Sequence, residues 1–189
     1  MGGEIGAGTT GRGARADDVV MLQPTIRIRR VTDLDACVEA LRTVHETDRY
    51  PVNWPTDPRA WLSPARLLQA WIVAESGGAV AGHVAVHRCP TVAASNQTPS
   101  RHVERARLYV TPAARRRSLA TALVGHVRCW AAKHGYGLTL NVADERRSAA
   151  VAFYEATGWR HSHTTEVDWT TSDGRPVKLR HYMLESRDA

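Results

Sequence analysis

The chain has 189 residues, of which 43% are hydrophobic and 23% charged, and its formal net charge of +6 is carried almost entirely by arginine. These values are typical of one globular domain, and the apolar runs fall far short of the roughly 18 residues that a membrane span needs. The three cysteines are widely spaced and form no CxxC pair. This argues against a disulfide framework or a zinc site and favours a reducing cytoplasm.

The first ordered element is expected at residue 25. Residues 1–24 are rich in glycine and lack hydrophobic periodicity, so they are predicted to form a disordered arm, and residues 25–189 a single domain. Alternating apolar residues predict a strand over 25–29. A helix capped by Thr32 or Asp33 should follow. Its apolar stripe is made of Leu34, Cys37, Val38, Leu41 and Val44.

A proline-rich segment comes next. In Asp57-Pro58 and Ser63-Pro64, a capping residue precedes a proline at the first helical position, so two short helices are predicted. Apolar residues over 70–74 and 80–87 predict a hairpin with glycines at its turn. Residues 90–100 are polar and are predicted to form a loop.

The second half of the chain alternates strands with helices. Strands are predicted over 103–110 and 138–142, with helices over 118–134 and from Ser148 to Gly158. A last hairpin should turn at 172–174. One face of its final strand is predicted to carry Val177, Leu179, His181 and Met183. The order β-α-α-β-β-β-α-β-α-β-β predicts an α/β or α+β domain with helices packed on a mixed sheet.

Three consecutive arginines, Arg115 to Arg117, stand between the strand over 103–110 and the helix after it. The first turn of a helix presents unpaired N–H groups and a partial positive charge. Small residues at the junction, such as Ser118 and Ala120, let phosphate oxygens reach that backbone. The junction is therefore a candidate phosphate site, although a solvated basic turn would contain the same residues.

Two segments resemble the GNAT superfamily of acyl-CoA-dependent N-acyltransferases. Residues 108–124, LYVTPAARRRSLATALV, resemble its motif A, an apolar strand with V-x-P followed by R/Q-x-x-G-x-G/A, with Ser118 where glycine is usual. Residues 150–159, AVAFYEATGW, resemble its A-x-x-F-Y-E-x-x-G-F/W segment, with Arg146 or Arg147 in place of the usual asparagine. The resemblance covers residues 25–185.

This resemblance implies a mixed, mostly antiparallel sheet of six to seven strands, flanked by about four helices, in which two splayed central parallel strands hold CoA. It implies acetyl-CoA as co-substrate, without a metal. The backbone of Leu108, Tyr109 and Val110 would bind the pantetheine arm. The diphosphate would be bound by Arg115, Arg116, Arg117, Ser118, Leu119, Ala120 and Thr121. Because serine has a Cβ, a loop that needs positive φ at Ser118 would be strained.

The reaction implied is direct transfer of an acetyl group to a primary amine of a small molecule or peptide. Tyr154 matches the family tyrosine that protonates the departing thiolate, and a phenol with a pKa of about 10 is protonated at neutral pH. Packing beside Phe153 is the alternative role for this tyrosine.

Glu104 stands where many family members carry a glutamate that accepts the proton of the amine. Its alternative role is to pair with Arg105 or Arg107. His102 and His83 are substitute candidates for the base.

The acceptor is not named by the sequence. Tyr50, Trp54 and Trp61 could stack on a flat or sugar-like acceptor, or they could close a small hydrophobic core. A catalytically silent acyl-CoA-binding module is the main alternative function. Nucleic-acid binding ranks below both because the other arginines are scattered, and no membrane partner is expected. The resemblance also implies a homodimer formed through the late strands.

Overall fold

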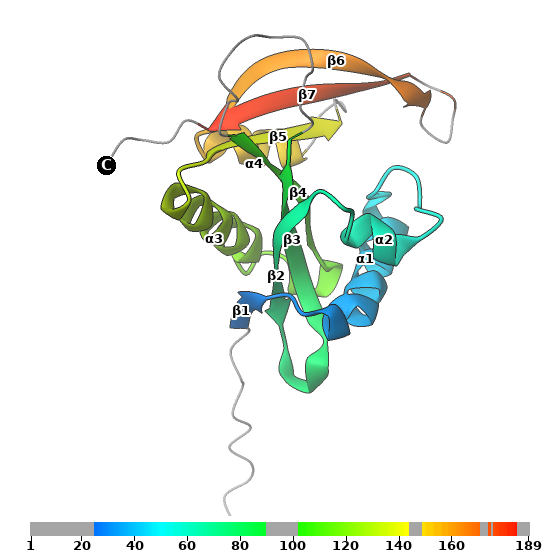
Figure 1. Cartoon of the computed structure of the whole chain (residues 1–189). Helices are drawn as coiled ribbons and strands as arrows, with labels where there is room; N and C mark the ends of the chain where they lie inside the picture. The colour runs from blue at the N-terminus through cyan, green and yellow to red at the C-terminus, as the bar shows by residue number, and fades with distance from the viewer. Residues whose placement is uncertain (1–24, 90–101, 144–148, 171–173, 175, 185–189) are drawn as a thin grey trace, which may run out of the picture.

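The computed structural model of the chain describes residues 25–89, 102–143, 149–170, 174 and 176–184. The strands are β1 (Thr25–Ile28), β2 (Leu67–Ala74), β3 (Val80–Arg88), β4 (His102–Val110), β5 (Gly137–Ala143), β6 (Arg160–Thr170) and β7 (Pro176–Leu184). The α-helices are α1 (Leu34–Asp48), α2 (Pro58–Leu62), α3 (Leu119–Lys133) and α4 (Ala149–Ala156) (Figure 1). This order of elements confirms the one predicted. The predicted arm over 1–24 and the loop over 90–100 lie outside the described residues.

The strands form one seven-stranded sheet in the order β1-β2-β3-β4-β5-β7-β6. All neighbouring strands are antiparallel except the central pair, β4 and β5. Within the described residues, this parallel pair is joined only from His102 to Glu104, opposite Gly137 to Thr139. Beyond Glu104 the two strands diverge (Figure 1). The predicted mixed, mostly antiparallel sheet with splayed central strands is therefore confirmed.

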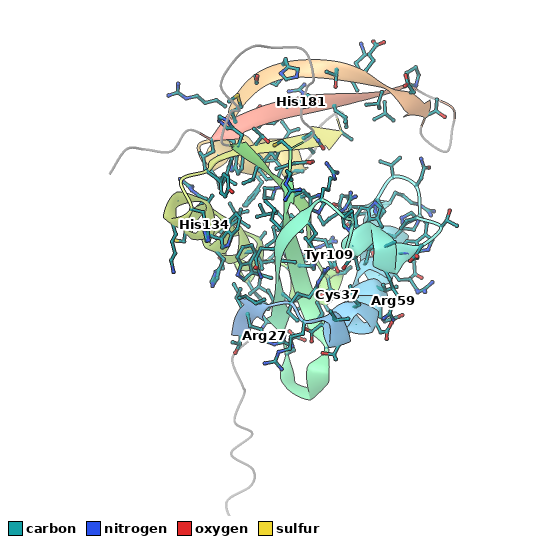
Figure 2. The ribbon with its side chains drawn as sticks, viewed as in Figure 1. Arg27, Cys37, Arg59, Tyr109, His134 and His181 are labelled. Atoms are coloured by element: carbon teal, nitrogen blue, oxygen red, sulfur yellow. The ribbon has the colours of Figure 1, made fainter. Side chains whose placement is uncertain are left out.

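Helices cover both faces of the sheet. α1 and α2 pack on one face, and α3 and α4 on the other (Figure 1). The periodic apolar stripe of α1 is buried at Leu34, Cys37, Leu41 and Val44, and each such side chain stabilises the fold by about 1.5–3 kcal/mol when fully buried. Tyr109 ties β4 to α1, since its hydroxyl donates to the Cys37 carbonyl at 2.8 Å (Figure 2).

Only one of the two short helices predicted in the proline-rich segment is present. Asp57 caps α2, its carboxylate accepting the amide of Ala60 at 2.9 Å. The helix predicted at Ser63-Pro64 is wrong, because Leu67 donates back to the Pro64 carbonyl in a turn and then begins β2. The Ser63 hydroxyl accepts from Arg29 at 2.7 Å. This partner is 34 residues away in sequence, so the hydroxyl is used in a tertiary contact and does not cap a helix.

Asp33 is the residue before α1, as expected, but its carboxylate does not cap the helix. Both carboxylate oxygens instead accept the guanidinium of Arg27, each at 2.8 Å, and one also accepts the Arg30 amide. The Arg27 hydrogen bonds are the main cause that lowers the pKa of Asp33 to about 2. This carboxylate therefore fastens β1 to the start of the first helix.

The final strand, β7, is buried mainly through a residue outside the predicted face. Tyr182 is fully buried against Tyr154 and Trp159, and its hydroxyl donates to Glu155 at 3.0 Å. Of the residues predicted to share the opposite face, Val177 is buried whereas Met183 is 36% exposed. The reason is that α4 covers the Tyr182 side of this part of the sheet.

Candidate functional site

The gap between β4 and β5 exposes one edge of β4. The amide of Thr111 donates to the Ala81 carbonyl of β3 at 2.9 Å. Because backbone groups of successive residues in a strand point to opposite edges, the polar groups of Leu108 and Val110 point toward the gap. This unpaired stretch includes the residues predicted to bind the pantetheine arm, and it can accept a ligand as an added strand.

The gap leads to the first turn of α3, where the backbone is unusual. Ser118 precedes the helix with φ of 55°, and Arg116 has φ of 59°. The Ser118 side chain does not cap the amides that open α3, and the amides of Leu119, Ala120 and Thr121 are the predicted diphosphate ligands. A 15-residue helix with an uncapped first turn has the geometry and partial charge that an anion needs.

The arginine triplet is divided among different partners. Arg115 forms a bidentate ion pair with Asp48 at the end of α1, and Arg117 pairs with Glu75 at 3.2 Å. All four side chains are 37–45% exposed, so each pair is worth at most about 1 kcal/mol and can exchange for a phosphate. Arg116 forms no ion pair with the described residues. Diphosphate binding by the triplet stays a prediction.

Replacing Ser118 by glycine should stabilise the protein. A residue with a Cβ held at positive φ is strained by about 1–2 kcal/mol, and glycine relieves that strain at the cost of a more flexible unfolded chain. We expect Ser118→Gly to raise the free energy of unfolding by about 1 kcal/mol, measured by urea denaturation. Ser118→Ala keeps the Cβ and serves as the control. Equal stability of the two variants would show that the loop is unstrained.

Tyr154, the predicted acid, projects from α4 into the core beside the gap. It is 4% exposed and packs against Trp159 and Tyr182. The guanidinium of Arg105 lies 4.7 Å from the centre of its ring. Burial raises the pKa of Tyr154, with Arg105 opposing the change. The phenol therefore stays protonated at neutral pH, as a proton donor must.

Tyr50 reaches the same region from the loop between α1 and α2. Burial raises its pKa to about 12. The other groups that act on its hydroxyl are Arg105, Arg107, Tyr154 and Glu104. The fold thus gathers three predicted residues, Tyr50, Glu104 and Tyr154, that are far apart in sequence.

The two tryptophans of this segment have partners of their own. Trp54 packs on α1, with the His45 ring 5.3 Å away and the Arg42 guanidinium 5.3 Å above its ring. Trp61 packs edge to face against Tyr50, and the Arg107 guanidinium lies 3.6 Å from the centre of the Trp61 ring. Both tryptophans pack against the apolar cluster under α1. They therefore close a small hydrophobic core, and any stacking on an acceptor would be a second role.

Glu104, the predicted base, lies at the point where β4 and β5 part. Its carboxylate accepts from Arg66 at 2.8 Å and from the Asn141 amide at 3.1 Å, and the side chain is 12% exposed. The alternative role, an ion pair with Arg105 or Arg107, is wrong, because the partner is Arg66 and the Arg105 side chain lies on the opposite face of β4 against Tyr154. An amine bound here would meet a carboxylate already held in place.

Both ring nitrogens of His83, a candidate substitute base, are engaged in hydrogen bonds. Its Nε2 accepts from Arg29 at 3.0 Å, so Nδ1 carries the hydrogen and donates to the Arg107 carbonyl at 2.9 Å. Burial lowers its pKa to about 3. His102 lies over Gly137, where an added Cβ would come within 2.5 Å of its ring. Neither imidazole is as well placed as Glu104 to accept a proton.

A pocket of about 310 Å³ opens between α3 and α4. It begins at Thr121 in the first turn of α3 and is lined further along by Val124, Arg128 and Phe153. Phe153 precedes Tyr154 in α4, but Tyr154 itself does not line this pocket.

Among the described residues, no group of three or more histidine, cysteine or acidic side chains has a metal-binding arrangement. No helix in the described part of the chain is long and apolar enough to cross a membrane.

Sequence reasoning missed three residues of the site. Arg66 and Asn141, which hold Glu104, lie 38 and 37 residues from it in the chain. Arg107 sits at an irregularity of β4, with φ of 53°, where the register with β3 shifts. β4 also contains His102, Glu104 and Arg105, so the charge of Arg107 did not set it apart in the sequence.

Comparisons with known proteins agree with this geometry. Residues 35–159 match the acetyltransferase (GNAT) family, whereas no curated protein matches the chain. The ribosomal-protein-S18-alanine N-acetyltransferase of Escherichia coli is 22% identical with a TM-score of 0.66, over 86% of this chain and 93% of that one. An N-acetyltransferase from Staphylococcus aureus Mu50 is 18% identical with a TM-score of 0.70, over 86% and 98%.

A third structure, NAA60 of Arabidopsis thaliana, was solved in complex with acetyl-CoA. It is 14% identical to this chain, with a TM-score of 0.64, over 85% of this chain and 97% of that one. At these identities the structures establish a shared fold, and the family match spans well over half of the chain. The protein therefore belongs to the GNAT family of acetyltransferases.

Proposed function

We propose that the protein is an N-acetyltransferase that moves an acetyl group from acetyl-CoA to a primary amine by direct attack. The observation that carries this proposal is the gap between β4 and β5, which joins a free strand edge to the uncapped first turn of α3. The complex of NAA60 with acetyl-CoA, a protein of the same fold, supports the choice of co-substrate.

In this proposal the CoA diphosphate binds at the first turn of α3, and the pantetheine arm pairs with Leu108 and Val110. Arg116 neutralises the diphosphate, and Arg115 and Arg117 exchange their exposed carboxylate partners for phosphate oxygens. A backbone N–H of β4 polarises the thioester carbonyl, which gains negative charge in the transition state. Binding of this kind places the thioester beside Glu104 and Tyr154, near the point where β4 and β5 part.

The acceptor amine attacks the carbonyl carbon as its proton passes to Glu104, directly or through a water. A C–N bond forms, the C–S bond breaks, and the electron pair of that bond leaves on sulfur. Tyr154 then donates its proton to the thiolate, and Arg105 stabilises the phenolate that is left behind. The products are an amide and free CoA.

Thermal unfolding with excess acetyl-CoA tests the co-substrate. A ligand at 100 times its dissociation constant adds about 2.7 kcal/mol of stability. For a chain of this length, that raises the unfolding temperature by about 5–10 °C. Acetyl-CoA and CoA should both produce the rise, and ATP should not. Absence of a rise with either CoA species would contradict the proposal.

A catalytically silent acyl-CoA-binding module is the second candidate, because Ser118 replaces the usual glycine. Both candidates predict the thermal shift, so release of the CoA thiol in the presence of amines separates them. Thiol release that depends on an amine supports the enzyme, and binding without release supports the silent module.

A further inference from the structure

The acceptor side of the site is the face of the sheet covered by α1 and α2. The uncapped turn of α3 and the pocket lined by Thr121 and Phe153 lie on the other face, where CoA is proposed to bind. The Glu104 side chain lies on the α1–α2 face, opposite His87 of β3 and in contact with Arg66. An amine must therefore approach from this side.

Among the described residues, the acceptor side carries more positive than negative charge. Arg66 contacts the Glu104 carboxylate, Arg107 lies close enough to interact with both, and Arg29 lies further along the same face, against His83. The two buried histidines of β3 add no charge, because burial lowers the pKa of each to about 3. Among the described residues of this side, Glu104 attracts an ammonium group, whereas Arg66 and Arg107 repel it.

Among the described residues Arg29 forms no ion pair, and it is held instead by the Leu62 carbonyl, the Ser63 hydroxyl and His83. Arg107 also forms no ion pair with a described residue. Its guanidinium lies 3.6 Å from the centre of the Trp61 ring, and its Nε donates to the Trp61 carbonyl at 3.3 Å. Burial lowers the pKa of Arg107, whereas Tyr50 and Glu104 oppose this change and Arg66 adds to it, so a further anion nearby would favour the charged form.

The backbone holds Arg107 in a costly conformation. Its φ of 53° lies in the left-handed region, at a bulge in the central strand. A residue with a side chain rarely adopts this conformation, because its Cβ is crowded by the backbone. Bulges of this kind often redirect one side chain at a functional site. Here the bulge turns the arginine onto Trp61, beside Tyr50, instead of into the sheet.

We infer that the acceptor amine also carries a carboxylate, which binds Arg107 and the exposed side of Arg66 while the amine faces Glu104. The inference rests on the proposed function and names its substrate class. An amine and a carboxylate a few bonds apart would complement the charges that the site presents. A free amino acid offers this chemistry, and so does a peptide that begins with an acidic residue.

The test measures acetyl transfer to matched amines with saturating acetyl-CoA. One set compares an amino acid with its carboxamide and with the amine that lacks the carboxyl group. The other compares C-terminally amidated peptides that begin with aspartate or asparagine. Hydrogen bonds to a charged group contribute about 1.5–3 kcal/mol, so kcat/KM should be about 10- to 150-fold higher for the carboxylate. The ratio in the first set would identify a free amino acid as the acceptor, and the ratio in the second set would identify a peptide that begins with an acidic residue.

Arg107→Met should remove this preference, mainly through KM, and leave kcat/KM for the carboxamide within about threefold. Arg107→Lys should restore part of the preference by restoring the charge. Arg42→Met is the matched control, because Arg42 also lies over a tryptophan, 5.3 Å from the Trp54 ring. Arg42→Met should leave kcat/KM unchanged for both the carboxylate and the carboxamide acceptor.

Equal use of carboxylates and neutral amines by the unmodified protein would overturn the inference and leave the proposed function intact. An equal loss for both acceptors in Arg107→Met would also overturn it, since that result indicates a structural role. Absence of transfer to every amine would overturn the proposed function and the inference with it.

Discussion

Tyr154→Phe should lower the rate of the chemical step by about two orders of magnitude, in the range that a general acid contributes. The phenylalanine fills the same space between Trp159 and Tyr182, so the core should remain packed. Acetyl-CoA binds through the β4 edge and the α3 turn in our proposal, so its dissociation constant should change less than about threefold. Single-turnover kinetics and calorimetric titration measure the two quantities separately.

The pH profile of the unmodified protein supplies a second test of Tyr154. Because burial raises its pKa, the protonated form persists above the usual pKa of about 10. Activity should therefore not fall through loss of this proton until the pH exceeds that value.

Tyr182→Phe is the control for loss of a buried phenol. Its hydroxyl donates to Glu155, so the change should lower stability by about 1 kcal/mol and leave the chemical step unchanged. If Tyr154→Phe keeps the full single-turnover rate, Tyr154 has no part in the mechanism.

Glu104→Gln should lower kcat/KM by about two to three orders of magnitude, because the amine loses the group that accepts its proton. Glutamine is close in size to glutamate and can keep the contact with Asn141. Arg66 loses its ion pair but is 39% exposed, so water can solvate it and the fold should survive. The acid limb of the pH–rate profile should shift or disappear.

Glu166→Gln is the matched control, since it breaks an exposed ion pair with Lys178, 3.0 Å long, on the outer hairpin. It should leave both the rate and its pH dependence unchanged. An unaltered acid limb in Glu104→Gln would assign the proton to another base or to bulk water.

Local sequence patterns predicted most of the fold. The apolar periodicity of α1 and α3, the cap at Asp57 and the alternation in the strands depend on residues within one or two turns of each other. Those interactions act in any chain context, so the order of the elements followed from them. The motif around Ser118 also indicated the positive φ that Ser118 adopts, while anion binding at this turn stays a prediction.

The failures share one physical cause. Ser63-Pro64 has the pattern of a helix start, yet Arg29 takes the serine hydroxyl and the next residues pair with β3. Asp33 has the pattern of a cap, yet Arg27 takes its carboxylate. In both cases a partner brought near by the tertiary fold makes a stronger interaction than the local one.

The sequence by itself determined the family and the element order, and it predicted three candidate residues that lie near the point where β4 and β5 part, namely Tyr50, Glu104 and Tyr154. The tertiary structure alone decided what surrounds them. In the fold, Arg66 and Asn141 donate hydrogen bonds to Glu104, and the Arg105 guanidinium lies over the Tyr154 ring. A bulge in β4 places Arg107 over the Trp61 ring. Charges interact through space, so the electrostatic character of the acceptor side depends on distances that no spacing along the chain encodes.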